Sequence, residues 1–311
     1  MGEKRDFSFL SADGIHQIHA VAWYADGPVR GVVQLTHGLS EYILRYDRFA
    51  RFLNSHGFHV VGHDHLGHGQ SVTGPGEYGC FPVENGWNIV NDDVHQVRQW
   101  AAEEWPGLPH FLLGHSMGSF QARTYLIRYP GSVDGCILSG TGQEEPSAIA
   151  GGKALAELIC KAKGPHYVSK LVGNLSLGAY NKQFAPNRTG SDWISRDEEA
   201  VDRYVADPLC QFLPTVGMFR DMLGGLQTLA CYDELLKMDR STPVALFSGD
   251  CDPVGDNGKG VKKVCALFRE AGCTDVTMKL YPGARHEILN EVNREEVYEN
   301  ILAWIEAHLP Q

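Results

Sequence analysis

Several features that would place this chain in other classes of protein are absent from its sequence. Lys and Arg number 27 against 38 Asp and Glu, which gives a formal net charge of −11 at pH 7. Nucleic-acid binding requires clustered positive charge for the phosphates, and no segment of this chain concentrates Lys or Arg. We therefore expect no nucleic-acid partner.

Cysteine pairs and long apolar runs are also missing. The chain has eight cysteines, at positions 80, 136, 160, 210, 231, 251, 265 and 273. No two form a C-x-x-C pair, which indicates buried thiols rather than a disulfide framework or a zinc site. No run approaches the roughly 18 apolar residues of a membrane span, and the first residues, MGEKRDFSFLSADG, contain no apolar core of a signal peptide. We expect no transmembrane segment and a cytoplasmic location.

Short apolar segments recur along the chain and alternate with helical patterns. Trp87, Val90, Val94 and Val97 recur at spacings of three and four, which is typical of a buried helix face, and residues 297–305 repeat the pattern. Each apolar segment ends at a turn containing Gly, His or Asp, as buried parallel strands do. This alternation predicts an α/β fold with a mostly parallel, doubly wound sheet. The expected strands are residues 31–37, 58–64, 110–116, 133–140, 243–250 and 276–283.

The N-terminal part of the chain has a different pattern. Residues 5–11 and 15–25 alternate polar and apolar side chains around Asp13 and Gly14. This pattern predicts an antiparallel hairpin at the edge of the sheet.

The strand pattern is interrupted once, between Gly140 and about residue 240. Within this stretch the helical apolar segments are residues 154–162, 167–177 and 216–226. We therefore expect a helical cap at 141–240, inserted into a core that consists of residues 1–140 and 241–311.

The stretch LLGHSMGSF contains a G-x-S-x-G motif directly after an apolar strand and before a helix. Gly114 and Gly118 permit a strained and closely packed backbone, and the turn projects the hydroxyl of Ser116 out of the sheet. The motif in this setting is a nucleophile elbow, so Ser116 is the predicted nucleophile.

A serine hydroxyl needs a base to take its proton and a carboxylate to orient that base. His286 follows the last strand in YPGARHEIL, and Asp250 and Asp252 follow the preceding strand in FSGDCDPVG. The order Ser, Asp, His is the one expected of α/β-hydrolases. His286 is therefore the predicted base, and the spacing leaves either aspartate as the acid.

An oxyanion hole is expected after the strand at 31–37, in LTHGLSEY. The backbone N–H of Leu39 can join that of Met117 in binding the developing negative oxygen, a contribution of roughly 3 to 4 kcal/mol per donor. Leu39 and Met117 are the predicted donors.

Five stretches together resemble one known family. THGLSEY, HDHLGHGQS, GLPHFLLGHSMGS, SGDCDPVGDNGKGV and GARHEILNE are similar to monoacylglycerol lipase and lysophospholipase-like α/β-hydrolases, which include the serine-aminopeptidase-domain proteins. The likeness runs nearly end to end and includes WISRDEEAVDRYVADPLC in the insert. The resemblance implies Ser116 as nucleophile, His286 as base, and Leu39 and Met117 as oxyanion donors.

The resemblance also separates the two candidate acids. The acid of the family follows a G-x-x-D pattern, which leads from Gly249 to Asp252. Asp250 still belongs to the end of the strand, so we expect it to brace the turn through backbone hydrogen bonds. Asp252 lies further out, before Pro253, and can reach the imidazole of the base. One position departs from the family, because Ser40 stands where the lipases usually have glycine.

Residues 63–69, HDHLGHG, raise the question of a metal site. Their spacing is similar to the H-x-H-x-D-H zinc motif of metallo-β-lactamase-type hydrolases, but Gly67 stands where that motif has its carboxylate. The downstream histidines that could complete a zinc site belong to the elbow and to the catalytic base. In the resembled family the segment has a D-x-x-G-x-G-x-S pattern, here Asp64, Gly67, Gly69 and Ser71, which shapes a turn beneath the active site. We expect no metal.

We predict a serine hydrolase that cleaves carboxylic esters through an acyl-enzyme and needs no cofactor. An apolar cap favours a small acyl ester, such as a monoacylglycerol or a lysophospholipid-like molecule. One alternative is a peptidase or amidase with an acidic pocket in its cap, supplied by Glu144 and Glu145 or by the acids ending at Glu199. Another is a catalytically inactive ligand-binding module, which loss of a triad member would favour. Assembly as a homo-oligomer is left open.

Overall fold

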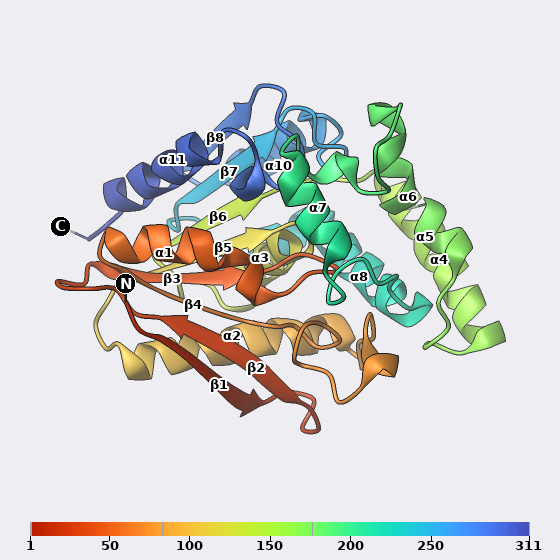
Figure 1. Cartoon of the computed structure of the whole chain (residues 1–311), viewed down its shortest axis with the longest axis horizontal. Coiled ribbons are helices and arrows are strands. Elements are labelled where there is room, and N and C mark those ends of the chain that lie inside the picture. Colours follow the sequence, from red (N-terminus) through yellow and green to blue (C-terminus); the bar gives the residue numbers. More distant parts are fainter. Residues whose placement is uncertain (1, 83, 176, 311) are drawn as a thin grey trace.

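The computed structural model describes residues 2–82, 84–175 and 177–310, and a single sheet forms its centre (Figure 1). Within these residues the sheet has eight strands in the order β1-β2-β4-β3-β5-β6-β7-β8. β2 pairs antiparallel with β1 and β4, and the remaining neighbours pair in parallel. The strands are β1 (Lys4–Leu10), β2 (Gln17–Trp23), β3 (Gly31–Thr36), β4 (Phe58–His63), β5 (His110–His115), β6 (Gly135–Ser139), β7 (Val244–Gly249) and β8 (Val276–Tyr281).

Apolar side chains cover both faces of the central strands, which explains their uninterrupted apolar sequences. Successive residues of a strand point to opposite faces. Phe111 and Leu113 of β5 therefore belong to one hydrophobic cluster, whereas Leu112 between them belongs to another. A strand that is buried on both faces needs helices on both sides of the sheet.

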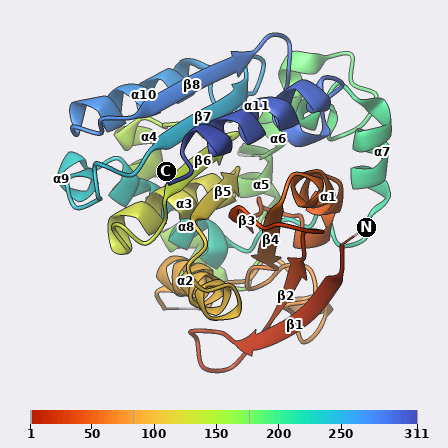
Figure 2. The ribbon, with the colours of Figure 1, turned by 90° about the vertical axis from the view of Figure 1, so that its left-hand side faces the viewer.

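Helices supply this cover on the two faces (Figure 2). α1 (Asp47–Ser55) and α11 (Arg294–Ala307) pack against one face. α2 (Gly86–Glu104), α3 (Met117–Arg128) and α10 (Lys259–Glu270) pack against the other. Short 3-10 helices occur in the core loops, namely η1 (Ile43–Tyr46), η2 (Pro75–Glu77) and η5 (Ile288–Asn290).

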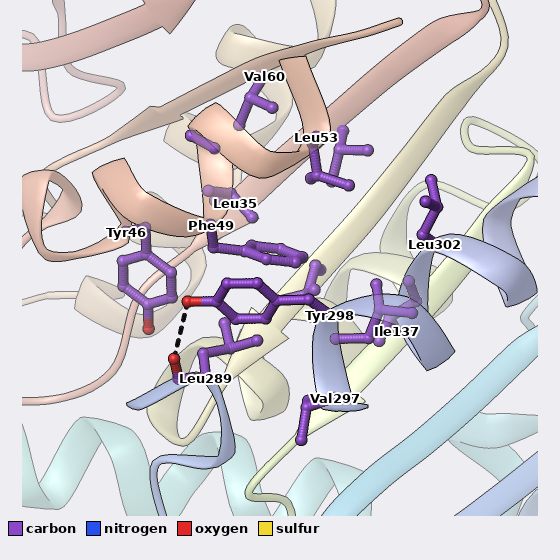
Figure 3. Close-up of a cluster of buried hydrophobic side chains, with 14 of the residues drawn as sticks. Leu35, Tyr46, Phe49, Leu53, Val60, Ile137, Leu289, Val297, Tyr298 and Leu302 are labelled. Carbon is purple, nitrogen blue, oxygen red and sulfur yellow. Dashed lines mark hydrogen bonds between the residues drawn. The ribbon is translucent and has the colours of Figure 1, made fainter. Parts of the chain in front are cut away.

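The core between α1 and α11 is close-packed (Figure 3). The rings of Phe49 and Tyr298 lie with their centroids 4.9 Å apart. The hydroxyl of Tyr298 donates to the carbonyl oxygen of Leu289 at 2.9 Å, so its polar atom is satisfied in an apolar setting. This contact connects α11 to the loop that follows β8.

The segment between β6 and β7 is helical, and its described residues contain no strand. Its helices α4, α5 and α6 lie on the side of the molecule away from the C-terminus (Figure 1). The elements are α4 (Pro146–Lys163), α5 (Lys170–Leu175), α6 (Leu177–Tyr180), η3 (Asn181–Phe184), η4 (Asp192–Ile194), α7 (Glu198–Ala206), α8 (Val216–Leu229) and α9 (Tyr232–Leu235).

The helix expected at residues 167–177 begins later than predicted, and its residue 176 lies outside the described residues. The oxygens of Pro165 and Tyr167 accept hydrogen bonds from Gly217 and Val216, at the start of α8. Ser169 then precedes α5, and its hydroxyl accepts from the N–H of Val172 at 3.3 Å, as an N-cap does. Tertiary contacts therefore hold residues 165–167 outside the helix.

The expected strands and the N-terminal hairpin are confirmed, with ends that match or differ by one or two residues. A mostly parallel sheet, helices on both faces and a helical insert form the predicted α/β-hydrolase fold. Across the described residues, no helix has both the length and the apolar character that crossing a membrane requires.

Candidate active site

Ser116 occupies a strained turn between β5 and α3. Its φ of 53° and ψ of −122° place a non-glycine residue in an unfavourable region. A Cβ on Gly114 would lie 2.2 Å from the oxygen of Gly118, and one on Gly118 would lie 2.0 Å from the oxygen of Thr36. Both flanking positions therefore require glycine, as expected for a nucleophile elbow.

The structure brings His286 together with Asp252 rather than with Asp250. Nδ1 of His286 lies 2.9 Å from Oδ2 of Asp252, and both side chains are buried. Oδ1 of Asp252 accepts from the N–H of Val254 at 2.9 Å. Oδ1 of Asp250 instead accepts from the N–H of Gly283 at 2.7 Å. Asp252 is therefore positioned to orient the imidazole of His286, whereas Asp250 stabilises the turn after β8.

Burial and charge act in opposite directions on the imidazole of His286. Burial alone would lower its pKa, but the charge and hydrogen bond of Asp252 raise the pKa above its ordinary value, with smaller contributions from Glu287 and Glu41. Deprotonation of this imidazole therefore requires a higher pH than that of a free histidine.

A narrow pocket connects the serine elbow, His286 and the loop after β3. Its volume is about 40 Å³. The lining residues are Gly38, Leu39, Ser40, Glu41, His115, Ser116, Trp193, Ile194, Tyr204, His286 and Glu287. Met117 follows the elbow serine, and its side chain is buried. Within the described residues, the N–H groups of Leu39 and Met117 donate to no other protein group, so both remain available to a ligand oxygen.

Sequence reasoning missed a buried ionic group beside this pocket. Arg45 donates to Glu41 Oε2 at 2.6 Å and forms two hydrogen bonds with the carboxylate of Glu287, at 2.8 and 2.7 Å. Burial raises the pKa of Glu41, whereas Arg45 overcomes the effect of burial and lowers the pKa of Glu287. Arg45 thus joins the loop that carries Leu39 to the loop that carries His286. Glu41 and Arg45 are only four residues apart, but the pairing of Arg45 with Glu287 spans 242 residues and has no local signal.

Two segments of the helical insert form hydrogen bonds with the loops that carry Ser40 and His286. The N–H groups of His286 and Glu287 donate to the oxygens of Trp193 and Ile194, at 3.4 and 2.7 Å. The ring of Trp193 lies 4.9 Å from that of His286. Ser40 has a φ of 57° at the position where the resembled lipases have glycine, and its hydroxyl donates to the oxygen of Phe212 at 2.7 Å. The insert therefore forms part of the pocket wall.

The segment HDHLGHG lies next to the loop after β3. Oδ1 of Asp64 accepts from the N–H of Ile43 at 2.8 Å, and the hydroxyl of Ser71 donates to the oxygen of Asp64 at 2.7 Å. His63, His65 and His68 are all buried, and burial lowers the pKa of each. In the part of the chain that the structure describes, no group of three His, Cys, Asp or Glu could hold a metal ion.

The acids considered for an amine-binding pocket lie elsewhere. Glu144, Glu145, Glu198 and Glu199 are exposed, and Asp197 is half-buried and pairs with Arg294. None of these acids lines the pocket at Ser116. Glu145 instead pairs with Lys263.

Comparison with known proteins identifies relatives over the whole chain. The chain is 30% identical to the monoacylglycerol lipase of Mycolicibacterium smegmatis, with 98% of each protein covered. It is 29% identical to human monoglyceride lipase, over 95% of this chain and 88% of the relative. Among solved structures, a thermostable carboxyl esterase from Bacillus coagulans, in complex with glycerol, matches with a TM-score of 0.92 and 29% identity over 100% of both chains.

A family model covers most of the chain as well. The model described as "Serine aminopeptidase, S33" matches residues 27–293. These limits include the elbow, the base, both aspartates and the whole helical insert. The chain therefore belongs to the serine aminopeptidase S33 family of α/β-hydrolases.

Proposed function

We propose that the chain is a serine hydrolase of carboxylic esters, with Ser116 as nucleophile, His286 as base and Asp252 as orienting acid. The observation that supports this most strongly is the 2.9 Å contact of His286 with Asp252 in the pocket that the serine elbow enters. Ester hydrolysis is also the reaction of the lipases and the esterase to which the chain is similar.

In the proposed mechanism each member of the triad has its own step. Oγ of Ser116 attacks the acyl carbonyl while His286 takes its proton, and His286 then gives that proton to the departing alcohol. His286 then takes a proton from a water molecule that attacks the acyl-enzyme, and it returns that proton to Oγ of Ser116 as the carboxylic acid leaves. Because Asp252 occupies Nδ1 of the imidazole, Nε2 is the nitrogen that exchanges the proton with Ser116. No step requires a cofactor.

The N–H groups of Leu39 and Met117 would bind the negative oxygen of the tetrahedral intermediate. Both groups lack a protein acceptor within the described residues, and Leu39 lines the pocket at Ser116. Such donors act most strongly in a site that excludes water, as a buried pocket does.

In this proposal residues 141–240 act as a cap over a core of residues 1–140 and 241–311. The pocket of about 40 Å³ is much smaller than the roughly 300 to 1,000 Å³ of ordinary ligand pockets. Trp193 and Tyr204 of the cap must therefore move before an acyl chain can enter. The names of the relatives favour a monoacylglycerol over a lysophospholipid-like substrate. In this proposal the enzyme is cytoplasmic, and its partner is a small acyl ester.

The peptidase alternative has weaker support. The family description refers to aminopeptidases, but the cap acids that could hold a substrate amine do not line the pocket at Ser116. The acids that do line the pocket, Glu41 and Glu287, are both bonded to Arg45.

A substrate screen tests the proposal against this alternative. Purified protein is assayed on monoacylglycerols and p-nitrophenyl esters of increasing chain length, alongside aminoacyl amides, with Ser116→Ala as the matched control. We expect hydrolysis of the esters and no turnover by the variant. Faster turnover of amides than of esters would favour the peptidase instead.

A further inference from the structure

His37 stands directly before the glycine of the oxyanion loop, and its side chain is completely buried. Its Nδ1 lies 2.7 Å from the carbonyl oxygen of Gly38. Its Nε2 lies 3.0 Å from the backbone nitrogen of His65, in the segment HDHLGHG. The triad makes no use of this histidine, although the residue is adjacent to the loop that carries Leu39.

These two contacts allow a single protonation state of His37. A carbonyl oxygen only accepts, so Nδ1 must carry the hydrogen that it shares with Gly38. A backbone N–H only donates, so Nε2 must present a lone pair to His65. The imidazole is therefore neutral with its proton on Nδ1. Burial and the neighbouring histidines agree with this state, because they lower the pKa of His37 well below its ordinary value.

The position of His65 is fixed in turn by a second pair of bonds. Its Nε2 lies 3.2 Å from the carbonyl oxygen of His37, and its Nδ1 lies 3.2 Å from Nε2 of His63. The same reasoning places a proton on Nε2 of His65, which leaves its Nδ1 as the acceptor from His63. His63 and His65 thus form a chain of hydrogen bonds that ends at His37 in the oxyanion loop, whereas the side chain of His68 is not part of it.

The bond from His37 fixes the direction of the Leu39 N–H. The carbonyl of Gly38 and the N–H of Leu39 belong to one trans peptide unit, so they point in opposite directions. Because His37 holds the carbonyl, the N–H is turned away from His37. Leu39 itself lines the pocket at Ser116. The N–H of Gly38 is held separately by Oε1 of Glu41 at 2.6 Å. A Cβ on Gly38 would lie only 3.0 Å from Cβ of Ser116, which shows how near this peptide is to the nucleophile.

We propose that His37 is a positioning residue that orients the Gly38–Leu39 peptide, so that the Leu39 N–H faces the oxygen of the bound acyl group. The backbone of His65 fixes the tautomer of His37 for this role. The inference rests on the proposed ester hydrolysis at Ser116. It gives the histidine-rich segment a function that requires no metal.

Two substitutions of His37 test the proposal. His37→Leu removes both hydrogen bonds. His37→Asn also loses the acceptor for His65, but its amide nitrogen stands as many bonds from Cα as Nδ1 does and can still donate to Gly38. Removal of an oxyanion donor costs roughly 10² to 10³ in kcat, so misdirecting one in His37→Leu should cost about 10-fold to 100-fold. KM should change little, because the interaction forms in the transition state. His37→Asn should recover most of the loss.

His68→Leu is the matched control. His68 is buried in the same cluster, and its Nδ1 bonds only to the oxygen of Leu66, at 2.9 Å. We expect this variant to lower the thermal midpoint as His37→Leu does, with kcat per labelled active site within a few-fold of wild type. If His37→Leu keeps the wild-type kcat, or if His37→Asn is no better than His37→Leu, the positioning role is wrong.

Nitrogen NMR of the wild-type protein tests the same proposal without relying on a variant that folds. The imidazole shifts of His37 should show a protonated Nδ1 and a bare Nε2. A proton on Nε2 would overturn the proposal. Fluorophosphonate labelling at Ser116 is checked first in wild type, so failure of the ester hydrolase assignment is distinguished from failure of the role of His37.

Discussion

Asp250 and Asp252 stand two residues apart after β7, and their carboxylates have different partners. Asp252→Asn should keep the fold and KM but lower kcat about 10⁴-fold, because the amide favours the wrong tautomer of His286. Asp250→Asn should keep kcat and lower the free energy of unfolding by about 1 kcal/mol, because the bond from Gly283 loses a charged acceptor. Steady-state kinetics and thermal midpoints measure both effects.

These two variants serve as controls for each other. A folded Asp252→Asn enzyme with near-normal kcat, beside a folded but inactive Asp250→Asn enzyme, would show that the acid was assigned to the wrong aspartate.

The pH dependence of the reaction follows from the environment of His286. In the proposed mechanism its neutral form is the base, and Asp252 raises its pKa above the ordinary 6.5. The acid limb of kcat/KM should therefore have its midpoint above that value, with activity lost as the pH falls through it. In Asp252→Asn the residual activity should show this midpoint at lower pH. If wild type and Asp252→Asn have the same midpoint, Asp252 does not raise the pKa of His286.

The candidate site residues could be located from the sequence because each follows a strand within a recognisable motif. Ser116 directly follows β5 and His286 lies in the loop after β8, where the parallel sheet brings the loops to one edge. The contact of Arg45 with Glu287 could not be predicted, since it joins loops that are 242 residues apart in the chain. The histidines of HDHLGHG could be recognised as unusual from the sequence. The contacts of His65 with His37 could not be predicted, because they depend on how the loop after β3 folds against this segment.

At the scale of elements, the N-terminal hairpin is attached to α2 through Asp93. Its carboxylate accepts from the hydroxyl of Ser11 at 2.8 Å and from the N–H of Ala12 at 2.7 Å. Burial nevertheless dominates and raises the pKa of Asp93 from 3.8 to about 7. The folded state therefore holds a proton that the unfolded chain releases. The protonated carboxyl group of Asp93 therefore adds to the free energy of unfolding. This contribution is complete below about pH 4 and is lost as the pH rises to about 7.

Asp93→Asn removes this titration, because its side chain stays neutral at every pH. The stability of the variant relative to wild type should increase as the pH rises from about 4 to about 7. Denaturant unfolding across this range measures the difference. If the free energy of unfolding of Asp93→Asn relative to wild type stays constant or decreases as the pH rises, burial does not raise the pKa of Asp93.

The strands were easier to predict than the helices of the insert. Strands buried on both faces have apolar sequences that end sharply at glycine, histidine or aspartate, so their limits can be read locally. The start of α5 depends instead on hydrogen bonds from residues 216–217 to the preceding turn. A local apolar pattern contains no information on such a contact.

For the whole molecule, the contacts among the catalytic loops and the insert matter most. Arg45 joins the oxyanion loop to the loop of His286, and residues 193–194 of the insert bond to that same loop. Movement of the insert during substrate entry would therefore change the position of the loop that carries His286. The overall architecture could be predicted because alternating elements specify a parallel sheet, whereas these cross-links required the folded structure.

Covalent labelling of Ser116 is the measurement that tests the central claim most directly. Wild-type protein is incubated with a fluorophosphonate, and the modified peptide is mapped by mass spectrometry, with Ser116→Ala and His286→Ala in parallel. We predict one label, on Ser116, that is absent from Ser116→Ala and much slower to form in His286→Ala. We also predict that ester turnover falls by roughly 10⁶ in either variant, because the two residues act as a unit. Labelling and ester turnover that persist in a folded Ser116→Ala protein would contradict the account.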